Sequence, residues 1–397
     1  MQGRKILFGV TGGIAAFKAA QWVRFLVKEE ARVTVVMTRA ATRFVSKLSF
    51  TALSGRPAYV ELFSDDPRQV MSHITLAAEA DALLIAPATA HTIARLAHGL
   101  ADDLLTTTVL AAAGKPVVVC PAMNSGMFTH PATQDNLRRL RELGYVVVEP
   151  DSGVLACGAE GPGRLPEWDG VRETLLSCFA PDDLRNQHIL VTAGPTREPL
   201  DPARYLSNRS SGKMGYALAR TARRRGAQVS LVSGPVALEP PPGVELFRVN
   251  TAREMHEQVM RLRDRASIII KAAAVADFRP ARSEPRKIKK STGTQAIDLV
   301  ANVDILAELG RKRRPGQILV GFAAESHDHE SEGTRKLHDK NLDLIVVNDI
   351  CGRETGFDAD TNQVTLIDKS GSSTLPLLSK EQTAERIWDH VVSLLNE

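Results

Sequence analysis

At 397 residues the chain is long enough for two hydrophobic cores, and its 43% hydrophobic, 24% charged and 5% aromatic residues are typical of a globular protein. Its 50 Lys and Arg nearly balance 46 Asp and Glu, so the net charge of +4 argues against a nucleic-acid or membrane surface and suits small anionic substrates. No apolar run approaches the ~20 residues needed to span a bilayer, and the first residues, MQGRKILFGV, lack the apolar core of a signal peptide. The four cysteines show no CxxC spacing. We therefore expect a cytoplasmic protein whose cysteines are free thiols.

Strands alternating with helices are predicted along the first half of the chain. Apolar runs predict strands at 5–10, 33–37, 82–86, 116–120 and 145–148, and amphipathic spacing predicts helices from 14, from 89 and at 133–142. This alternation predicts an α/β fold with a mostly parallel sheet and a site at the carboxyl ends of its strands.

The first turn of this half is rich in glycine. Gly12 and Gly13 follow the first strand, but no GxGxxG motif is present, and the second strand ends in Thr38 and Arg39 instead of a ribose-binding acid. A hydroxyl and a cation favour a phosphate-bearing ligand over NAD. The turn alone is equally compatible with the glycine turn of any doubly wound sheet.

Three further places carry chemistry. They are His73 before an apolar helix, the run from Pro121 to Asn124, and Cys157 in a glycine-rich segment that continues to Arg164. Each alone is also compatible with a structural role, such as a helix cap, a turn or a small buried side chain.

Together with TGGIAAFK at 11–18 and APAT at 86–89, these motifs resemble, in order and spacing, the flavin-containing cysteine decarboxylases over residues 4–180. The resemblance implies a flavodoxin-like fold and FMN, which removes a hydride from the carbon bearing sulfur so that CO2 can leave. It implies that His73 acts as an acid/base and positions the substrate, and that Asn124 donates hydrogen bonds to the substrate. It also implies that Cys157 is a proton donor. The implied FMN contacts are Gly12, Gly13, Ile14, Ala15, Thr38, Ala86, Pro87, Ala88 and Thr89.

The middle of the chain, residues 188–215, predicts an anion site. An apolar strand at 188–193 is followed by a polar loop and by an amphipathic helix that begins at Gly212-Lys213. Ser207 and Met214 stand where a Walker A loop needs Gly and Ser or Thr. The loop carries polar side chains suited to an anion: Arg197, Arg204, Asn208, Ser210 and Ser211.

This stretch closely resembles the signature of the phosphopantothenoylcysteine synthetase half of the bifunctional coenzyme A biosynthesis enzymes. The resemblance implies that 4′-phosphopantothenate attacks CTP to form an acyl-cytidylate, from which cysteine displaces CMP, with Mg2+ or Mn2+ neutralising phosphate charge. It implies that Asn208 and Lys287 stabilise the reacting acyl phosphate, that Arg204 and Ala273 hold the intermediate, and that Asp277 binds nucleotide or metal. The other implied nucleotide contacts are Asn302, Val303, Asp304, Ile305, Phe322, Lys336 and Lys340.

The α/β rhythm continues through the second half. Strands are predicted at 228–232, 244–249, 267–271, from 318 and at 344–347, a helix at 252–265, and a hairpin and helix at 363–377 and 381–395 that we assign to packing or dimer contact. The six basic residues at 279–290 suit a mobile flap over a triphosphate better than a nucleic-acid contact. Two residues depart from the family that the stretch resembles: Lys271 stands where a small residue is common, and Val303 stands where the family usually has proline. Either departure is expected to shift the affinity for CTP without abolishing it.

We therefore expect two Rossmann-like domains, a decarboxylase at 1–184 and a ligase at 185–397. The expected partners are 4′-phosphopantothenate, cysteine and CTP, without nucleic acid or membrane. The resemblance implies a homo-oligomer with trimeric decarboxylase contacts and dimeric ligase contacts, compatible with a dodecamer. A flavoprotein with one activity, or a flavin-binding regulatory protein of the same fold, is the alternative; joint retention of His73, Asn124, Cys157, Asn208 and Lys287 argues against both.

Overall fold

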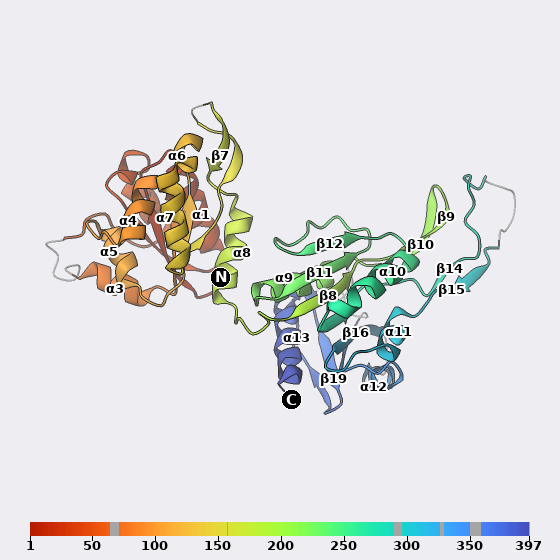
Figure 1. Cartoon of the computed structure of the whole chain (residues 1–397). Coiled ribbons are helices and arrows are strands. Elements are labelled where there is room, and N and C mark those ends of the chain that lie inside the picture. Colours follow the sequence, from red (N-terminus) through yellow and green to blue (C-terminus); the bar gives the residue numbers. More distant parts are fainter. Residues whose placement is uncertain (64–70, 157, 290–295, 326–328, 350–358, 397) are drawn as a thin grey trace. The chain divides into compact units, whose positions relative to one another are not determined.

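The computed structural model describes residues 1–63, 71–156, 158–289, 296–325, 329–349 and 359–396. The chain divides into two compact units, Met1–Phe179 and Ala180–Glu397 (Figure 1). Each unit is a parallel-sheet α/β structure, so the predicted fold class is confirmed. Among the helices described, none combines the length and the apolar character needed to cross a bilayer.

The first unit is built on a five-stranded parallel sheet in the order β2-β1-β3-β4-β5. This is the doubly wound order expected of a flavodoxin-like fold. Its central strands are buried on both faces, which is why they are continuous apolar runs without polar alternation. The strands are β1 (Lys5–Val10), β2 (Arg32–Met37), β3 (Ala82–Ala88), β4 (Val117–Pro121) and β5 (Val146–Val147).

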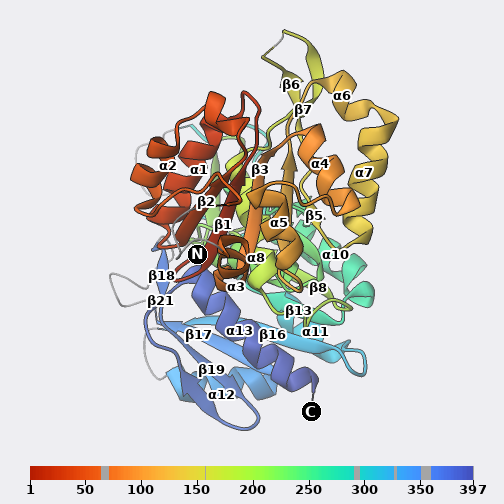
Figure 2. The same cartoon turned by 90° about the vertical axis from the view of Figure 1, so that its left-hand side faces the viewer.

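Helices cover both faces of this sheet (Figure 2). One face carries α1 (Ala16–Lys28), α2 (Lys47–Ser54) and α8 (Trp168–Phe179). The other carries α3 (Ser72–Glu79), α4 (Ala90–His98), α5 (Leu104–Ala111) and α7 (Pro131–Glu142). The unit also contains η1 (Ala41–Arg43), α6 (Ser125–Thr129) and a hairpin of β6 (Asp151–Val154) and β7 (Glu160–Arg164).

The second unit is built on an eight-stranded sheet in the order β12-β11-β8-β13-β16-β17-β19-β20. It is parallel from β12 to β17, and the last two strands run antiparallel. The strands are β8 (His188–Ala193), β11 (Gln228–Ser233), β12 (Glu245–Arg248), β13 (Ile268–Lys271), β16 (Ile318–Glu325), β17 (Leu344–Asp349), β19 (Val364–Asp368) and β20 (Ser372–Thr374).

Two groups of helices enclose the second sheet. The first group is α9 (Lys213–Arg224) and α13 (Lys380–Leu395). The second is α10 (Ala252–Leu262) with η2 (Arg263–Arg265), α11 (Ile305–Arg311) and α12 (His329–Asp339). The predicted terminal hairpin is present as β19–β20, and the predicted closing helix is α13, which buries Ile387, Trp388 and Val391 against α9.

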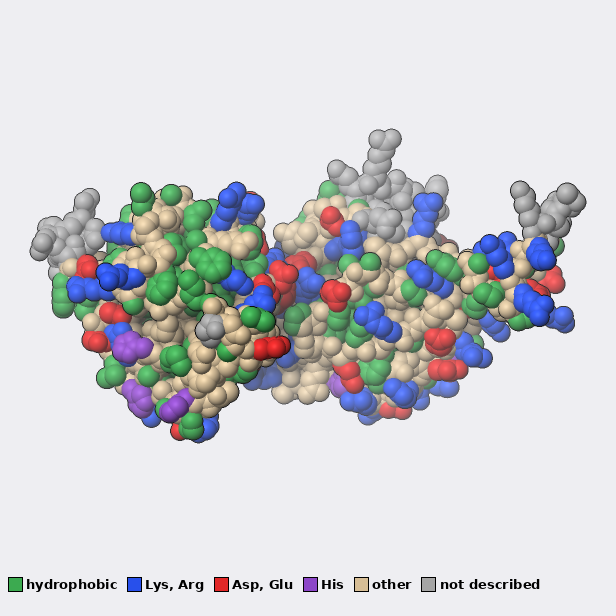
Figure 3. Space-filling model, turned by 90° about the horizontal axis from the view of Figure 1, so that it is seen from above, with side chains coloured by type: hydrophobic (Ala, Val, Ile, Leu, Met, Phe, Trp, Pro, Cys, Tyr) green, Lys and Arg blue, Asp and Glu red, His purple; other side chains and the backbone are tan. Residues whose placement is uncertain are grey.

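Three small two-stranded pieces complete the second unit. They are β9 (Arg197–Asp201) with β10 (Arg204–Ser207), β14 (Phe278–Pro280) with β15 (Leu299–Ala301), and β18 (Thr361–Asn362) with β21 (Leu378–Ser379). The first two stand out from the main sheet (Figure 1). Basic side chains gather near β14 and β15, at the right of the space-filling view (Figure 3).

The prediction of a loop after β8 was wrong for residues 197–207, which form the β9–β10 hairpin. The carboxylate of Asp201 closes its turn by accepting hydrogen bonds from the N–H groups of Ala203 at 2.8 Å and Arg204 at 2.9 Å. Polar side-chain contacts stabilise this hairpin. Its strands lack the alternation of apolar and polar residues that predicts a strand from sequence, so they were not predicted.

Candidate active sites

The first unit contains a cavity of about 740 Å3 between the ends of β1 and β3. This is where the strand order reverses, the usual ligand position in doubly wound sheets. The cavity is lined by the expected flavin contacts Gly12, Thr38 and Thr89. The other expected contacts flank these three in the turn before α1 and along β3, where Ala86 and Ala88 are fully buried.

Thr11 holds the two turns of this cavity together. Its fully buried hydroxyl donates to the carbonyl of Pro87 at 2.6 Å and accepts from the N–H of Thr89 at 3.1 Å. Thr89 in turn caps α4 by accepting from the N–H of Thr92. Sequence reasoning had not singled out Thr11 as the residue that joins them.

The residues present fit a flavin nucleotide. The volume is in the range of small-molecule sites, and Thr38 and Thr89 offer hydroxyl donors to a phosphate. The guanidinium of Arg39 lies beside them, paired with the carboxylate of Glu61. At Gly12 a Cβ atom would lie 2.4 Å from the Cβ of Ala40, so only glycine allows the turn this close to the wall of the cavity.

The expected catalytic residues of this unit lie apart from the cavity lining. His73 is in the first turn of α3, and its buried Nδ1 has no hydrogen-bond partner among the described residues. Asn124 follows β4 and caps α6 by accepting from the N–H of Gly126 at 2.9 Å. Neither lines the 740 Å3 cavity within the described part of the unit. Cys157 lies outside the described residues.

The β6–β7 hairpin packs tightly on the loop that carries Asn124. The N–H of Met123 donates to the carbonyl of Gly163 at 2.9 Å. A Cβ on Gly163 would lie 2.2 Å from the carbonyl oxygen of Met123, and one on Gly161 would lie 2.8 Å from the hydroxyl of Ser125. Both glycines have positive φ, 124° and 149°. The glycine-rich sequence thus allows this hairpin to contact the Asn124 loop.

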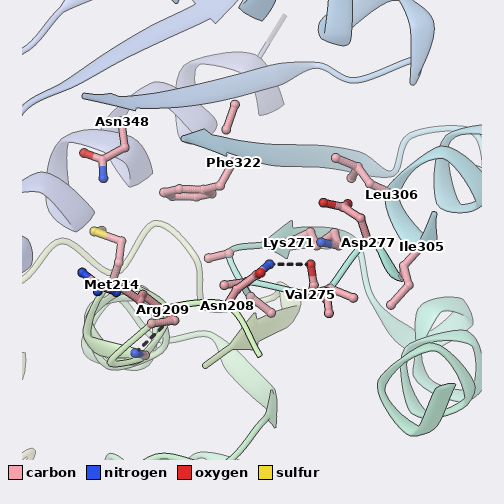
Figure 4. A pocket seen from close by; sticks show the side chains of 18 of the residues that line it. Asn208, Arg209, Met214, Lys271, Val275, Asp277, Ile305, Leu306, Phe322 and Asn348 are labelled. Carbon is pink, nitrogen blue, oxygen red and sulfur yellow. Dashed lines mark hydrogen bonds between the residues drawn. The ribbon is translucent and has the colours of Figure 1, made fainter. Parts of the chain in front are cut away.

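The second unit contains a cavity of about 630 Å3 at the carboxyl ends of β13 and β16 (Figure 4). It gathers side chains from α9, from the loop after β13, from α11, β16 and α12. Most of the expected ligase residues line it: Asn208, Ala273, Asp277, Asn302, Val303, Asp304, Ile305, Phe322, Lys336 and Lys340.

Hydrogen bonds fix the loop after β13, which forms the floor of this cavity. The buried hydroxyls of Thr192 and Thr196 accept from the N–H groups of Ala273 at 3.2 Å and Ala276 at 3.1 Å. Asn302 donates from its amide to the carbonyl of Ala276 at 2.8 Å. Two threonines of the β8 region therefore place Asp277 at the cavity without touching a ligand themselves.

Asn208 points into the same cavity, where its amide donates to the carbonyl of Val275 at 3.0 Å (Figure 4). Asp304 caps α11 and pairs with Lys340 at 2.9 Å. Burial opposes ionisation of Asp304, but hydrogen bonds from Ala307 N–H and Lys340 outweigh it and hold its pKa below the ordinary value. Desolvation lowers the pKa of Lys271 to about 8 despite the nearby carboxylate of Asp304.

Arg204 and Lys287 do not line the cavity as the structure describes it. The guanidinium of Arg204 pairs with Asp201 at 2.5 Å and donates to the carbonyl of Ile288 at 2.9 Å. Asp201 also accepts from the N–H of Ile288 at 3.1 Å. The β9–β10 hairpin therefore holds the exposed segment that carries Lys287, while Lys290 lies outside the described residues.

Sequence reasoning missed part of the lining contributed by the C-terminal segments. Asn348, Asn362 and Lys380 line the cavity, beside Lys213 and Met214 at the start of α9. Strand β18, which carries Asn362, was not predicted, and the helix that carries Lys380 was predicted only from residue 381, as an element for packing or dimer contact. Their signal was two polar residues, Asn362 and Lys380, at the ends of short apolar segments.

Two family models match the chain in consecutive segments. The model described as flavoprotein matches residues 1–179, and the model described as DNA/pantothenate metabolism flavoprotein C-terminal domain matches residues 184–395.

Full-length relatives and solved domains are similar to the chain. The coenzyme A biosynthesis bifunctional protein CoaBC of Bacillus subtilis strain 168 is 46% identical over 99% of this chain and 98% of its own length. The protein of the same name from Escherichia coli K12 is 44% identical over 100% and 98%. A solved CoaBC C-terminal domain is 41% identical, covering 54% of this chain and 98% of its own, with a TM-score of 0.47. The FMN-dependent cysteine decarboxylase SpaF is 34% identical, covering 45% and 98%, with a TM-score of 0.40.

Proposed function

The chain belongs to the family of bifunctional coenzyme A biosynthesis proteins CoaBC, and from this membership we propose how its residues divide the chemistry. It is an enzyme with phosphopantothenoylcysteine decarboxylase and phosphopantothenate–cysteine ligase activities. We assign the decarboxylase to the first unit and the ligase to the second.

In the ligase, 4′-phosphopantothenate is activated by CTP before cysteine is added. The carboxylate of the acid attacks the α-phosphorus, pyrophosphate leaves, and the amine of cysteine then displaces CMP from the acyl-cytidylate. Asn208 donates to the reacting acyl phosphate, and Lys287 approaches it from the exposed basic segment. Placed donors of this kind stabilise the charge that develops in the transition state.

The nucleotide lies over the floor loop, with Asp304, Ile305 and Phe322 around its base and sugar. This placement is supported by the fact that all three residues line the cavity, in which Phe322 and Ile305 are drawn (Figure 4). Lys336 and Lys340 neutralise phosphate charge. The exposed carboxylate of Asp277 is the proposed Mg2+ ligand, because Mg2+ usually combines one or two carboxylates with phosphate oxygens. Mg2+ when bound lowers the negative charge that the attacking carboxylate must approach.

In the decarboxylase, FMN when bound supplies the two-electron oxidant that gives the substrate carbanion an electron sink. His73 positions the substrate and exchanges a proton through its imidazole, and Asn124 donates to the carboxylate end. Cys157 returns a proton when the saturated thiol is formed. The glycine turn at Gly12 and the hydroxyl of Thr38 hold the phosphate of the cofactor.

We propose that a second copy of the chain completes this site. His73 and Asn124 lie outside the cavity lining of their own unit, and the imidazole Nδ1 of His73 is buried without a partner among the described residues. Ile14 and Phe17, beside the glycine turn, are 59% and 61% exposed, as expected of an apolar contact between copies. A trimer is the expected arrangement.

One observation carries the ligase assignment: Asn208, Asp277 and Asp304, from three separate segments, meet at one cavity of about 630 Å3. The test is product analysis with 4′-phosphopantothenate, CTP, cysteine and Mg2+. Lys287→Ala should block the cysteine adduct, whereas the matched control Lys289→Ala, in the same exposed segment, should not. Cys157→Ser should form the adduct, release CO2 and stop before the saturated thiol. Full 4′-phosphopantetheine output from both Lys287→Ala and Cys157→Ser would contradict these roles.

A further inference from the structure

Helix α3 of the first unit carries His73 in its first turn and is short. It has eight residues, and a helix of this length is marginally stable without tertiary contacts. Its N-cap, Met71, makes no side-chain cap, so the start of the helix lacks the usual capping oxygen. The position of His73 therefore depends strongly on the contacts that hold the rest of α3.

The imidazole of His73 is not oriented through its Nδ1 atom. This nitrogen is buried and has no hydrogen-bond partner among the described residues. A ring nitrogen without a partner leaves the backbone of α3 to decide where the imidazole lies.

Apolar packing holds α3 against the sheet. The helix lies beside α5 (Figure 1 and Figure 2), and Leu76 and Ala77, 8% and 2% exposed, belong to the core of that face. Hydrophobic contact is non-directional. It keeps α3 on the sheet and leaves the position along the helix axis to directional contacts.

Lys115 makes such directional contacts at the end of α3. Its ammonium donates to three backbone carbonyls there, those of Ala77 at 2.7 Å, Ala78 at 2.6 Å and Ala80 at 2.5 Å. The last carbonyls of a helix have no partners within the helix. An ammonium has three N–H donors, so these three carbonyls can take all of them.

The charge of Lys115 also matches the dipole of α3. The C-terminal end of a helix carries partial negative charge, and a cation stabilises it. The last turn of α3 contains Glu79 and no basic residue of its own. Lys115 supplies the cation from another segment, and the small side chains of the alanines leave the carbonyls accessible to it.

The segment that carries Lys115 is itself tied to the sheet. The N–H of Lys115 donates to the carbonyl of Ala112 at 3.2 Å, and the carbonyl of Pro116 accepts from the N–H of Leu83 in β3 at 2.9 Å. Lys115 therefore joins the end of α3 to the edge of the sheet from which β3 and β4 begin. A rise of about 1.5 Å per residue places His73 about 10 Å along the axis from Ala80.

We infer that Lys115 is a positioning residue of the decarboxylase, which fixes α3 along its axis and thereby the imidazole of His73. The inference rests on the role proposed for His73 and goes beyond it. Lys115 does not line the flavin cavity as the structure describes it, so it acts only through the helix. Because a second copy of the chain is proposed to complete the site, the place of His73 must be set within its own unit.

The test uses the full-length protein, with CO2 release from 4′-phosphopantothenoylcysteine as the activity. Lys115→Met removes the donors and keeps the length of the side chain, whereas Lys115→Arg keeps a cation with N–H donors. The control is Lys28→Met, which removes an exposed lysine from the last turn of α1 in the same unit. Flavin absorbance, thermal melting and pyrophosphate release from CTP show whether each variant is folded.

Lys115→Met should lower kcat about 10- to 100-fold, because a displacement of about 1 Å at a catalytic group costs this much in rate. KM, flavin content and pyrophosphate release should stay near wild type. Hydrogen–deuterium exchange should become faster at residues 72–80 and stay unchanged in α4. Lys115→Arg should recover most of kcat, and Lys28→Met should match wild type in every measurement.

A double variant with His73→Asn separates positioning from general support of the fold. If Lys115 acts through His73, Lys115→Met should lower the residual rate of His73→Asn by less than about twofold, because coupled residues are not additive. An equal loss in both backgrounds would mean that Lys115 acts independently of His73, and it would overturn the inference.

Wild-type kcat in folded Lys115→Met would also refute the inference. So would a joint loss of flavin, thermal stability and activity that Lys115→Arg does not recover, because Lys115 would then support the unit as a whole. If His73→Asn alone keeps the wild-type rate, the role proposed for His73 fails instead. Exchange at residues 72–80 in Lys115→Met then decides separately whether Lys115 holds α3.

Discussion

A single hydroxyl, that of Thr11, joins the two turns that form the flavin cavity. Thr11→Val keeps the shape but leaves the carbonyl of Pro87 and the N–H of Thr89 without their buried partner. We expect a loss of about 2 kcal/mol, a melting temperature of the first unit lower by ~4–8 °C, and less bound flavin. Absorbance near the flavin band and thermal melting measure both effects.

Thr11→Ser is the matched control, because serine keeps the hydroxyl and loses only a methyl group. It should retain flavin and most of the stability. Equal flavin content in Thr11→Val and Thr11→Ser would show that the methyl group, and not the two hydrogen bonds, positions the turns.

Asp201 makes the second unit sensitive to acid. The hydrogen bond from Arg204 is the largest influence, and with the N–H groups of Ala203 and Ile288 it holds the pKa of Asp201 well below the ordinary value. A carboxylate with a lowered folded-state pKa stabilises the protein above the unfolded-state pKa of about 4, and this stabilisation is lost as the pH falls toward the folded-state value. Asp201→Asn should therefore destabilise the second unit at pH 7, by an amount that shrinks below pH 4.

Urea unfolding of wild type and Asp201→Asn at pH 7 and pH 3 measures this difference. A difference in unfolding free energy that is the same at both values would mean that the geometry of the turn matters and the charge of Asp201 does not.

At the level of single residues, more of the expected ligase residues than of the expected decarboxylase residues lie in the lining of one cavity. Asn208 lies just before α9, Asp277 lies in the loop after β13, and Asp304 caps α11, and all three line the same cavity. Asn362 could not be predicted in the same way. It meets Met214 across 148 positions of sequence, through strand β18, which lies outside the main sheet.

Among the elements, the β6–β7 hairpin depends on its glycines. Gly163→Ala would place a Cβ 2.2 Å from the carbonyl oxygen of Met123 at a φ of 124°, so the hairpin must move away from the Asn124 loop. Backbone strain of this kind costs about 1–3 kcal/mol. We expect decarboxylation to fall at least tenfold while pyrophosphate release from CTP is unchanged.

Gly170→Ala is the control for this change, since nothing lies within 4 Å of the added Cβ in helix α8. It should keep both activities. Normal decarboxylation by Gly163→Ala would mean that the contact between the hairpin and the Asn124 loop has no part in the reaction.

Elements with a buried apolar run were predictable, and elements held by polar contacts were not. The strands β1, β3 and β8 are continuous or nearly continuous apolar runs because helices cover both faces of their sheets. The β9–β10 and β6–β7 hairpins have no such face. Their turns and glycines, and not an alternation of apolar residues, decide their structure.

For the whole molecule, the alternation of strands and helices predicted two sheets. The polar segment at 180–183 was predicted to separate the part of the chain that forms the first sheet from the part that forms the second. The polar residues of that segment also have a structural role. Asp183, just after the boundary between Phe179 and Ala180, pairs with the buried guanidinium of Arg225 at 2.5 Å. The same guanidinium reaches Asp389 of α13 at 2.8 Å, so it ties the start of the second unit to its last helix.

Arg225 therefore tests whether the two units unfold separately. Its side chain is 2% exposed, and Arg225→Met leaves Asp183 and Asp389 without their shared cation, which should cost about 3 kcal/mol in the second unit. Because each unit has its own cores, calorimetry should show two transitions, and the variant should lower only one of them. Flavin release should follow the other transition and stay at its wild-type temperature. A single transition that moves together with flavin release would show that the two units unfold as one cooperative structure.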